Sequence, residues 1–392
     1  MADTIAFPAH AQSRAVSLPT IPWYLWASVV GVTSAMIGVH WDISWHRSIG
    51  RDTFWTPPHL AIYLCGVIAG LSSAYLILAT TFGKLPEVRA ASIKMWGFYG
   101  PLGAFITAWG GVAMLVSAPF DDWWHNAYGL DVKILSPPHT VLAAGIIGIE
   151  VGALMLVLGY MNRAEGEERR RLHWLYIYLG AMILVVTQIL TLEYTFNIGQ
   201  HMAMFYRAVA IAVPTILVGI AIGSENRWAA TIVASVYMVF TAALIWILPL
   251  FPAEPKLGPV LTPVTQFVPP NFPLLLIVPA IAIDLLRRLF KGRTGTGAMW
   301  LQAVVLGTAF LATFLAVQWP FATFLVSPAG HNAFFGTIYF DYGTSPNGYN
   351  FRGIFVPTER NFARMMMLAL GAAIVTTRIG LGWGTWMRTV KR

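Results

Sequence analysis

The sequence has little charge and almost no cysteine. Only 11% of its 392 residues are Asp, Glu, Lys or Arg, and its single cysteine, Cys65, lies in an apolar run, so no intrachain disulfide can form. Hydrophobic residues make up 57% of the chain and the mean hydropathy is +0.64, which excludes a soluble domain. The sequence also lacks a GxGxxG fingerprint, a Walker-type phosphate loop and the Cys-x-x-Cys-His motif of attached haem. These absences exclude the common nucleotide-binding and c-type haem proteins.

Long apolar runs recur along the chain. Most are about 18 to 24 residues long, the length that a helix needs to cross about 30 Å of hydrocarbon. Strand-like alternation over ten residues is absent, so we predict an all-α polytopic membrane protein with about ten transmembrane helices. The predicted helices cover 22–39, 59–82, 96–118, 139–161, 173–192, 203–223, 228–249, 270–286, 298–319 and 361–382.

Lysine and arginine are distributed unequally between the two sides of these helices. An even number of crossings puts both termini on one side, where the connections hold seventeen Lys and Arg residues against six on the other side. Because positively charged connections stay in the cytoplasm, we expect a multi-pass protein of the cytoplasmic (inner) membrane with both termini cytoplasmic. The net charge of +8 is then a topology signal, and the partner it indicates is the lipid bilayer, not nucleic acid.

This topology divides the chain into three parts. Residues 1–21 form a cytoplasmic segment, 22–161 a tandem helix-hairpin unit, and 162–392 six further helices with a long outer loop at 320–360. The nine histidines are unevenly placed between the two sides. Seven of them fall on or beside the outer face, namely His40, His46, His59, His125, His139, His201 and His331.

The first outer connection, HWDISWHRSIGRDTFWTPPH at 40–59, is crowded with His, Asp and Arg. Asp42 and His46 are four residues apart, which on a helix places the carboxylate and the imidazole on one face. A Pro-Pro pair suits the first turn of the returning helix, where a missing N–H is no loss, and His59 follows in that turn. One Asp and two His that converge at a membrane surface form a ligand set for copper, zinc or iron and leave positions open.

The second outer connection, DDWWHNAYGLDVKILSPPH at 121–139, repeats the pattern. Asp121 and His125 are again four residues apart, and His139 follows a second Pro-Pro pair. A single Asp-x-x-x-His is more often a hydrogen-bonded pair than a ligand pair, whereas two copies with matched third histidines favour at least one bound metal ion. Asp122 competes with Asp121 as the ligand. The sequence leaves one dinuclear site and two mononuclear sites open.

Further ionisable side chains accompany the two sets. Arg51, Asp52 and Asp131 are predicted to orient the ligands from outside the metal's own shell, since Gly50 and Asp52 of the first connection match Gly129 and Asp131 of the second. The remaining candidates for such a role, or for an extra site, are His40, Asp122, Glu193, His201 and His331.

The first connection resembles a known metal-binding segment. Its runs Asp42-x-x-Trp45-His46, Arg-Asp-Thr at 51–53 and Thr-Pro-x-His at 56–59 closely resemble a segment in one of the membrane subunits of the copper membrane monooxygenases, the particulate methane and ammonia monooxygenases. In that family the segment joins two membrane helices, and its Asp and two His bind copper near the membrane surface. The resemblance implies that Asp42, His46 and His59 are copper ligands. It covers 42–59 only, and the family's membrane subunit has fewer helices and works with two partner subunits.

The resemblance also implies a function. It implies a membrane protein that holds one or two copper ions at the outer face and oxidises a small apolar substrate with O₂. Electrons would come from an external donor, and partner subunits in a homo- or hetero-oligomer are implied as well. A copper-handling or oxidase-assembly protein and a non-catalytic structural subunit are the alternatives, and zinc or iron are the alternatives to copper. No catalytic residue is assigned.

Overall fold

The computed structural model describes residues 21–129, 136–196, 199–258, 260, 263–293, 295–339 and 359–391. This part of the chain is mostly helical, and eight of its helices are long and apolar enough to cross a membrane. They are α2 (Pro57–Thr81), α4 (Leu102–Tyr128), α5 (Pro137–Met161), α6 (Gly166–Leu190), α7 (Ala203–Gly223), α8 (Ala229–Ile247), α10 (Thr296–Leu325) and α12 (Phe362–Met387). The predicted class, an all-α protein with several membrane-spanning helices, is confirmed at this level.

The remaining elements are shorter or more polar. The first helix, α1 (Trp23–Ser48), has 26 residues but is not among the eight, so ten crossings stay a prediction. The other elements are α3 (Pro86–Ala90), an antiparallel hairpin of β1 (Ile93–Met95) and β2 (Phe98–Gly100), α9 (Ile277–Leu286), and the 3₁₀ turns η1 (Leu192–Tyr194), η3 (Leu248–Leu250), η4 (Arg287–Phe290) and η5 (Pro328–Gly330).

The helix predicted at 270–286 forms only in part. Its helical portion, α9, begins at Ile277 and has ten residues, whereas 267–276 is irregular. Pro270 and Pro273 lie in the irregular part, and proline both removes a backbone donor and clashes with the preceding turn of a helix. Ten helical residues reach only about 15 Å, roughly half of the hydrocarbon thickness.

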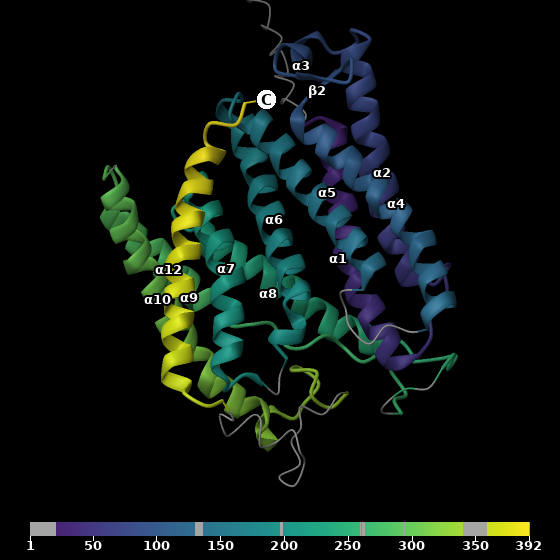
Figure 1. Cartoon of the computed structure of the whole chain (residues 1–392), viewed down its shortest axis with the longest axis vertical. Coiled ribbons are helices and arrows are strands. Elements are labelled where there is room, and N and C mark those ends of the chain that lie inside the picture. Colours follow the sequence, from purple (N-terminus) through teal and green to yellow (C-terminus); the bar gives the residue numbers. More distant parts are fainter. Residues whose placement is uncertain are drawn as a thin grey trace, which may run out of the picture.

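The helices form one elongated bundle whose two ends differ (Figure 1). The start of α1 and the end of α12 lie at the same end: the hydroxyls of Tyr24 and Tyr160 are hydrogen-bonded, and the amide of Asn162 donates to the carbonyl of Met387 over 2.9 Å. The short helix α3 and the β hairpin lie at this end too. The junctions α1–α2 and α4–α5, which carry the Asp and His residues, lie at the opposite end.

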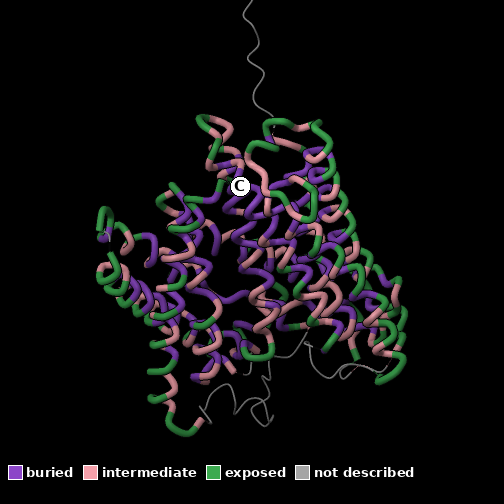
Figure 2. Tube along the Cα trace, turned by 45° about the horizontal axis from the view of Figure 1, so that its top comes forward, coloured by how far each residue is buried: buried purple, intermediate pink, exposed green. Residues whose placement is uncertain are grey.

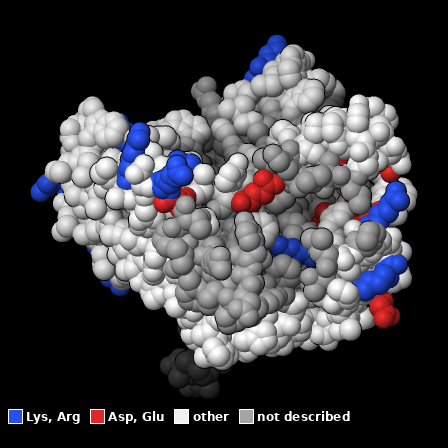
Figure 3. Space-filling model, turned by 60° about the horizontal axis from the view of Figure 1, so that its bottom comes forward, with Lys and Arg blue, Asp and Glu red and all other residues white. Residues whose placement is uncertain are grey.

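Buried residues fill the interior of the bundle and exposed ones line its outside (Figure 2). Many exposed positions are apolar, including Leu71 and Val239, each 68% exposed. A helix that is apolar on its outer face as well as its inner face is typical of a membrane span. The end face that carries the Asp/His junctions shows few charged side chains among many uncharged ones (Figure 3).

Glycines allow α4 and α5 to approach until their backbones touch. A Cβ on Gly103 would lie 2.5 Å from the carbonyl oxygen of Gly152, and a Cβ on Gly110 would lie 2.7 Å from that of Gly145. Small residues at such crossings are a common means of packing membrane helices. This contact fixes α4 against α5 and therefore the position of Asp121 and His125 relative to His139.

We expect Gly110→Ala to destabilise the protein by about 1–3 kcal/mol, because the added methyl group must push two helix backbones apart. Gly148→Ala is the matched control, since its Cβ would meet nothing closer than the Cα of Gly110 at 3.4 Å. Thermal unfolding in detergent measures both. Equal midpoints for the two variants would show that the close approach at Gly110 is not tightly packed.

Candidate metal centre

The first ligand set is formed where α1 ends and α2 begins. Asp42 and His46 project from one face of the last turns of α1, with His46 Nε2 3.7 Å from Asp42 Oδ2. His59 lies in the first turn of α2, which starts with two prolines as the sequence predicts, and its Nε2 is 3.4 Å from Asp42 Oδ1. The structure therefore brings together the three residues that the resemblance implies as ligands.

Asp52 joins this set as a fourth member. Its Oδ2 lies 3.0 Å from His59 Nε2 and 3.5 Å from His46 Nε2. Burial raises the pKa of the Asp52 carboxyl, but hydrogen bonds and charge from His46 and His59 outweigh that effect and hold it below its ordinary value. The sequence predicts a supporting role for Asp52, whereas the structure places its carboxylate among the candidate ligand atoms, with Asp42 and His46. Its counterpart, Asp131, lies outside the described residues.

The second ligand set has the same form at the junction of α4 and α5. Asp121 Oδ1 lies 3.4 Å from His125 Nε2 and 3.4 Å from His139 Nε2. Ser136 caps α5 by accepting a hydrogen bond from the backbone of His139. Asp122 is turned elsewhere, because its Oδ2 accepts from the amide of Asn126 over 3.4 Å. Of the two competing aspartates, Asp121 is the one that faces the histidines.

A glycine turn orients one histidine in each set. Gly50 and Gly129 both have positive φ, +100° and +85°, which a residue with a side chain rarely adopts. Each turn brings the glycine carbonyl back to the imidazole four residues earlier: His46 Nδ1 is 3.4 Å from Gly50 O, and His125 Nδ1 is 3.0 Å from Gly129 O. A proton on Nδ1 leaves Nε2 free to bind metal, as is usual for ligating histidines.

The donor sets fit a small transition-metal ion. Imidazole with carboxylate suits copper, zinc and iron. Bonds of about 2.1 Å in a tetrahedral site put ligand atoms about 3.4 Å apart, close to the separations within both sets. Asp42 Oδ1 and Asp121 Oδ1 are buried and accept no hydrogen bond, so each has an oxygen available for an ion. Without metal, the same atoms pair as carboxylates with imidazoles.

One cavity connects the two sets. It has a volume of about 290 Å³ and is lined by Asp52 and His59 of the first set and by Asp121 and His125 of the second. Tyr63 of α2 also lines it. Each set retains its own group of ligand atoms. The geometry thus shows two ligand groups on one shared cavity.

The other candidate residues lie elsewhere in the described part of the chain. His40 points away from its neighbour Asp42, with Nδ1 2.7 Å from the carbonyl of Met36. His201 lies against α10, with Nε2 3.1 Å from the carbonyl of Trp319. Neither belongs to a ligand group, and the same holds for Glu193 in η1 and for His331 after η5. Arg51 lines the shared cavity, and its carbonyl accepts from the indole of Trp45.

Sequence reasoning underestimated Asp52. The signal was present, since Gly50 and Asp52 recur with the same spacing at Gly129 and Asp131. A repeated glycine turn followed by an aspartate indicates a chain that folds back on the preceding helix, which brings the carboxylate to the histidines. Comparison with models of protein families, with curated proteins and with solved structures finds no match for this chain.

Proposed function

We propose that this chain is a multi-pass membrane protein that binds copper at its outer face and supports the O₂-dependent oxidation of a small apolar substrate. The observation that carries the proposal is the pair of Asp/His ligand groups on one cavity at one end of a membrane bundle. The resemblance of residues 42–59 to the metal-binding segment of the copper membrane monooxygenases favours copper over zinc or iron. Partner subunits and an external electron donor belong to the same proposal.

The chain's own residues would hold and orient the metal. Asp42, His46, Asp52 and His59 would bind one ion, and Asp121 with His125 and His139 would bind a second. Bound copper would supply the one-electron redox chemistry that reactions with O₂ require. The glycine carbonyls would keep the imidazole Nε2 atoms directed at the ions.

The cavity wall suits a small apolar molecule beside polar ligands. Phe54, Tyr63 and Ala118 provide apolar surface, and they lie within the same cavity as the ligand residues His59 and His125. A pocket with mostly apolar walls and a few convergent polar groups is the usual form of a small-molecule site. The Tyr63 ring lies next to that of His59, with the centroids 5.9 Å apart, which holds the imidazole from its open side.

A copper-handling protein is the second candidate, and one observation favours it. The His46 side chain is 38% exposed, so an ion bound there would be open to exchange with a carrier. An enzyme would consume O₂ together with substrate, whereas a handling protein would exchange copper reversibly without using O₂. A structural subunit would do neither.

The test is O₂ consumption by copper-loaded protein in native-like membranes, supplied with a reductant and with small hydrocarbons or ammonia. We expect substrate-dependent O₂ uptake that is lost in His125→Ala and kept in His173→Ala. His173 is a suitable control because its imidazole bonds to Ser224 at the other end of the bundle. Copper exchange without O₂ uptake would reject the enzyme and favour copper handling.

A further inference from the structure

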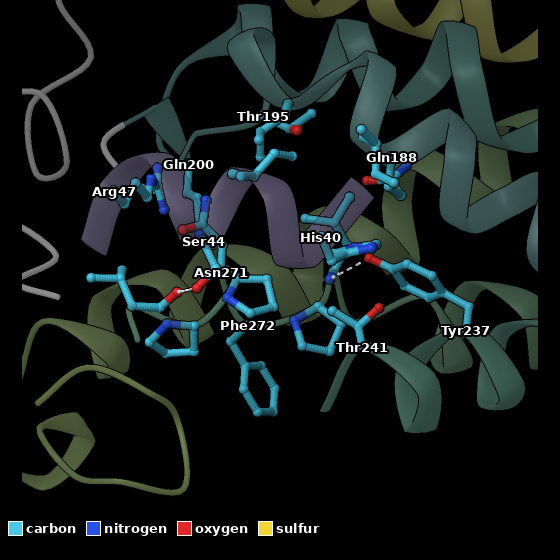
Figure 4. A pocket seen from close by; sticks show the side chains of 18 residues that line it. His40, Ser44, Arg47, Gln188, Thr195, Gln200, Tyr237, Thr241, Asn271 and Phe272 are labelled. Atoms are coloured by element: carbon cyan, nitrogen blue, oxygen red, sulfur yellow. Dashed lines mark hydrogen bonds between the residues drawn. The ribbon is translucent and has the colours of Figure 1, made fainter. Parts of the chain in front are cut away.

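A second pocket lies on the other face of α1, away from the metal centre (Figure 4). Its volume is about 70 Å³, and it lies between α1, α6, α8 and the irregular segment 268–274. His40 and Ser44 line it, four residues apart on one face of the helix, whereas Asp42 and His46 project from another face toward the metal centre. The helix thus separates two polar sites.

Three buried polar groups at this pocket have no partner in the protein. They are the side-chain amide nitrogens of Gln188 and Asn271 and the hydroxyl of Thr241, and all three residues line the pocket. A buried polar group that makes no hydrogen bond costs about 1–3 kcal/mol. Three such groups around one cavity are therefore expected to bind something that accepts hydrogen bonds.

The pocket also offers a hydrogen-bond acceptor. His40 is 9% exposed, and its Nδ1 lies 2.7 Å from the carbonyl of Met36, so the proton is on Nδ1. The ring nitrogen Nε2 is then an acceptor. Tyr237 accepts a hydrogen bond from the backbone of Leu274 over 3.1 Å, which leaves its own O–H as a further donor. A ligand that satisfies the whole set needs both an acceptor and a donor.

The charge of the lining selects against ions. Among the described residues around the pocket no carboxylate occurs, so nothing there would stabilise a cation. Its one cation is Arg47, at the end of the pocket away from His40 (Figure 4). The guanidinium of Arg47 lies 5.6 Å from the centre of the Phe196 ring. The groups near His40 are all neutral, and neutral hydrogen-bonding groups suit an uncharged ligand.

We propose that this pocket binds a small uncharged molecule with both a hydrogen-bond acceptor and a donor, of the class of simple amides and alcohols. The cavity has room for roughly five water molecules, or one molecule of that size. This binding site is separate from the copper centre and from the oxidation proposed there. A failure of either proposal leaves the other standing.

The single cysteine of the chain makes an accessibility experiment clean. Cys65 is fully buried, so Cys65→Ala gives a cysteine-free background. In that background, Thr241→Cys places a thiol at the pocket, and the neutral reagent methyl methanethiosulfonate reports whether small molecules enter. We expect the thiol at 241 to react at least tenfold faster than one introduced by Thr377→Cys. Thr377 is an equally buried hydroxyl of α12 that does not line the pocket.

Protection then identifies the ligand class. We expect saturating acetamide to slow the modification at position 241 at least fivefold, while acetate, which has the same shape and a negative charge, does not. Adding Asn271→Leu should raise the acetamide concentration needed by about tenfold. Gln188→Cys gives a second reporter position if Thr241→Cys folds poorly. Equal rates at 241 and 377, no protection by acetamide, or equal protection by acetate would each overturn the proposal.

Discussion

Replacing His59 with alanine is expected to lower the affinity of the first ligand set for copper by about 100-fold or more. Loss of a group that merely orients a ligand costs about 10–100-fold, and the loss of a ligand should reach at least the upper end. The His59 imidazole lies between both carboxylates, 3.4 Å from Asp42 and 3.0 Å from Asp52, so its loss leaves two buried carboxylates without a cation. Competition with a copper chelator of known affinity measures the effect.

His173→Ala is the matched control for this experiment. It removes a histidine of similar burial at the opposite end of the bundle, where the imidazole bonds to Ser224. Wild-type affinity in His59→Ala would show that the first set is a network of ion pairs and not a metal site. A parallel loss in both variants would indicate general damage to the fold.

Asp52→Asn is expected to weaken copper binding at the first set by about 10–100-fold while leaving the second set unchanged. The substitution keeps the size of the side chain and removes its charge, so it separates the ligand role from a packing role. The carboxylate lies within 3.5 Å of both imidazoles of the set. The readout is the copper-binding isotherm of Asp52→Asn in the His125→Ala background, where only the first set can bind.

Glu225→Gln controls for the loss of an acidic group. Glu225 pairs with Arg169 at the far end of the bundle, 2.6 Å away, and does not line the shared cavity. An Asp52→Asn isotherm that overlays the control would return Asp52 to the supporting role that the sequence alone predicts.

Local sequence patterns were sufficient for much of the helical framework. Apolar runs placed helices such as α5 and α7 nearly at their observed bounds, because a membrane span is defined by its own composition. The Pro-Pro-His ending correctly predicted a helix start at Pro57 and Pro137, since proline favours that position in any context. The spacing of Asp42 and His46 likewise follows from helix geometry alone.

The path of the first connection depended on distant residues. A segment some two hundred residues later packs against it: the backbone of Leu257 donates to the carbonyl of Ile49 over 3.0 Å, and a Cβ on Gly50 would lie 2.6 Å from the carbonyl oxygen of Gly258. This contact fixes the turn that brings Asp52 back to the histidines. No local pattern encodes a contact between chain segments so far apart, which is why the role of Asp52 could not be predicted.

The prolines of the irregular segment show the opposite error. Its composition is apolar enough to predict a helix, yet Pro270 and Pro273 keep the chain irregular up to Ile277. The same irregular segment supplies Asn271 to the second pocket. Hydropathy alone therefore misplaced a helix at the point where the chain forms a polar site.

The most direct test of the central claim is the copper content of gently purified, copper-reconstituted protein. Wild type is compared with His46→Ala, His125→Ala and the double variant. We predict about one to two ions per chain in wild type, a fall of about one in each single variant that loses an occupied set, and none in the double variant. Zinc in place of copper would contradict the redox role. No bound metal in wild type would contradict the central claim and leave the Asp and His residues as an ion-paired structural network.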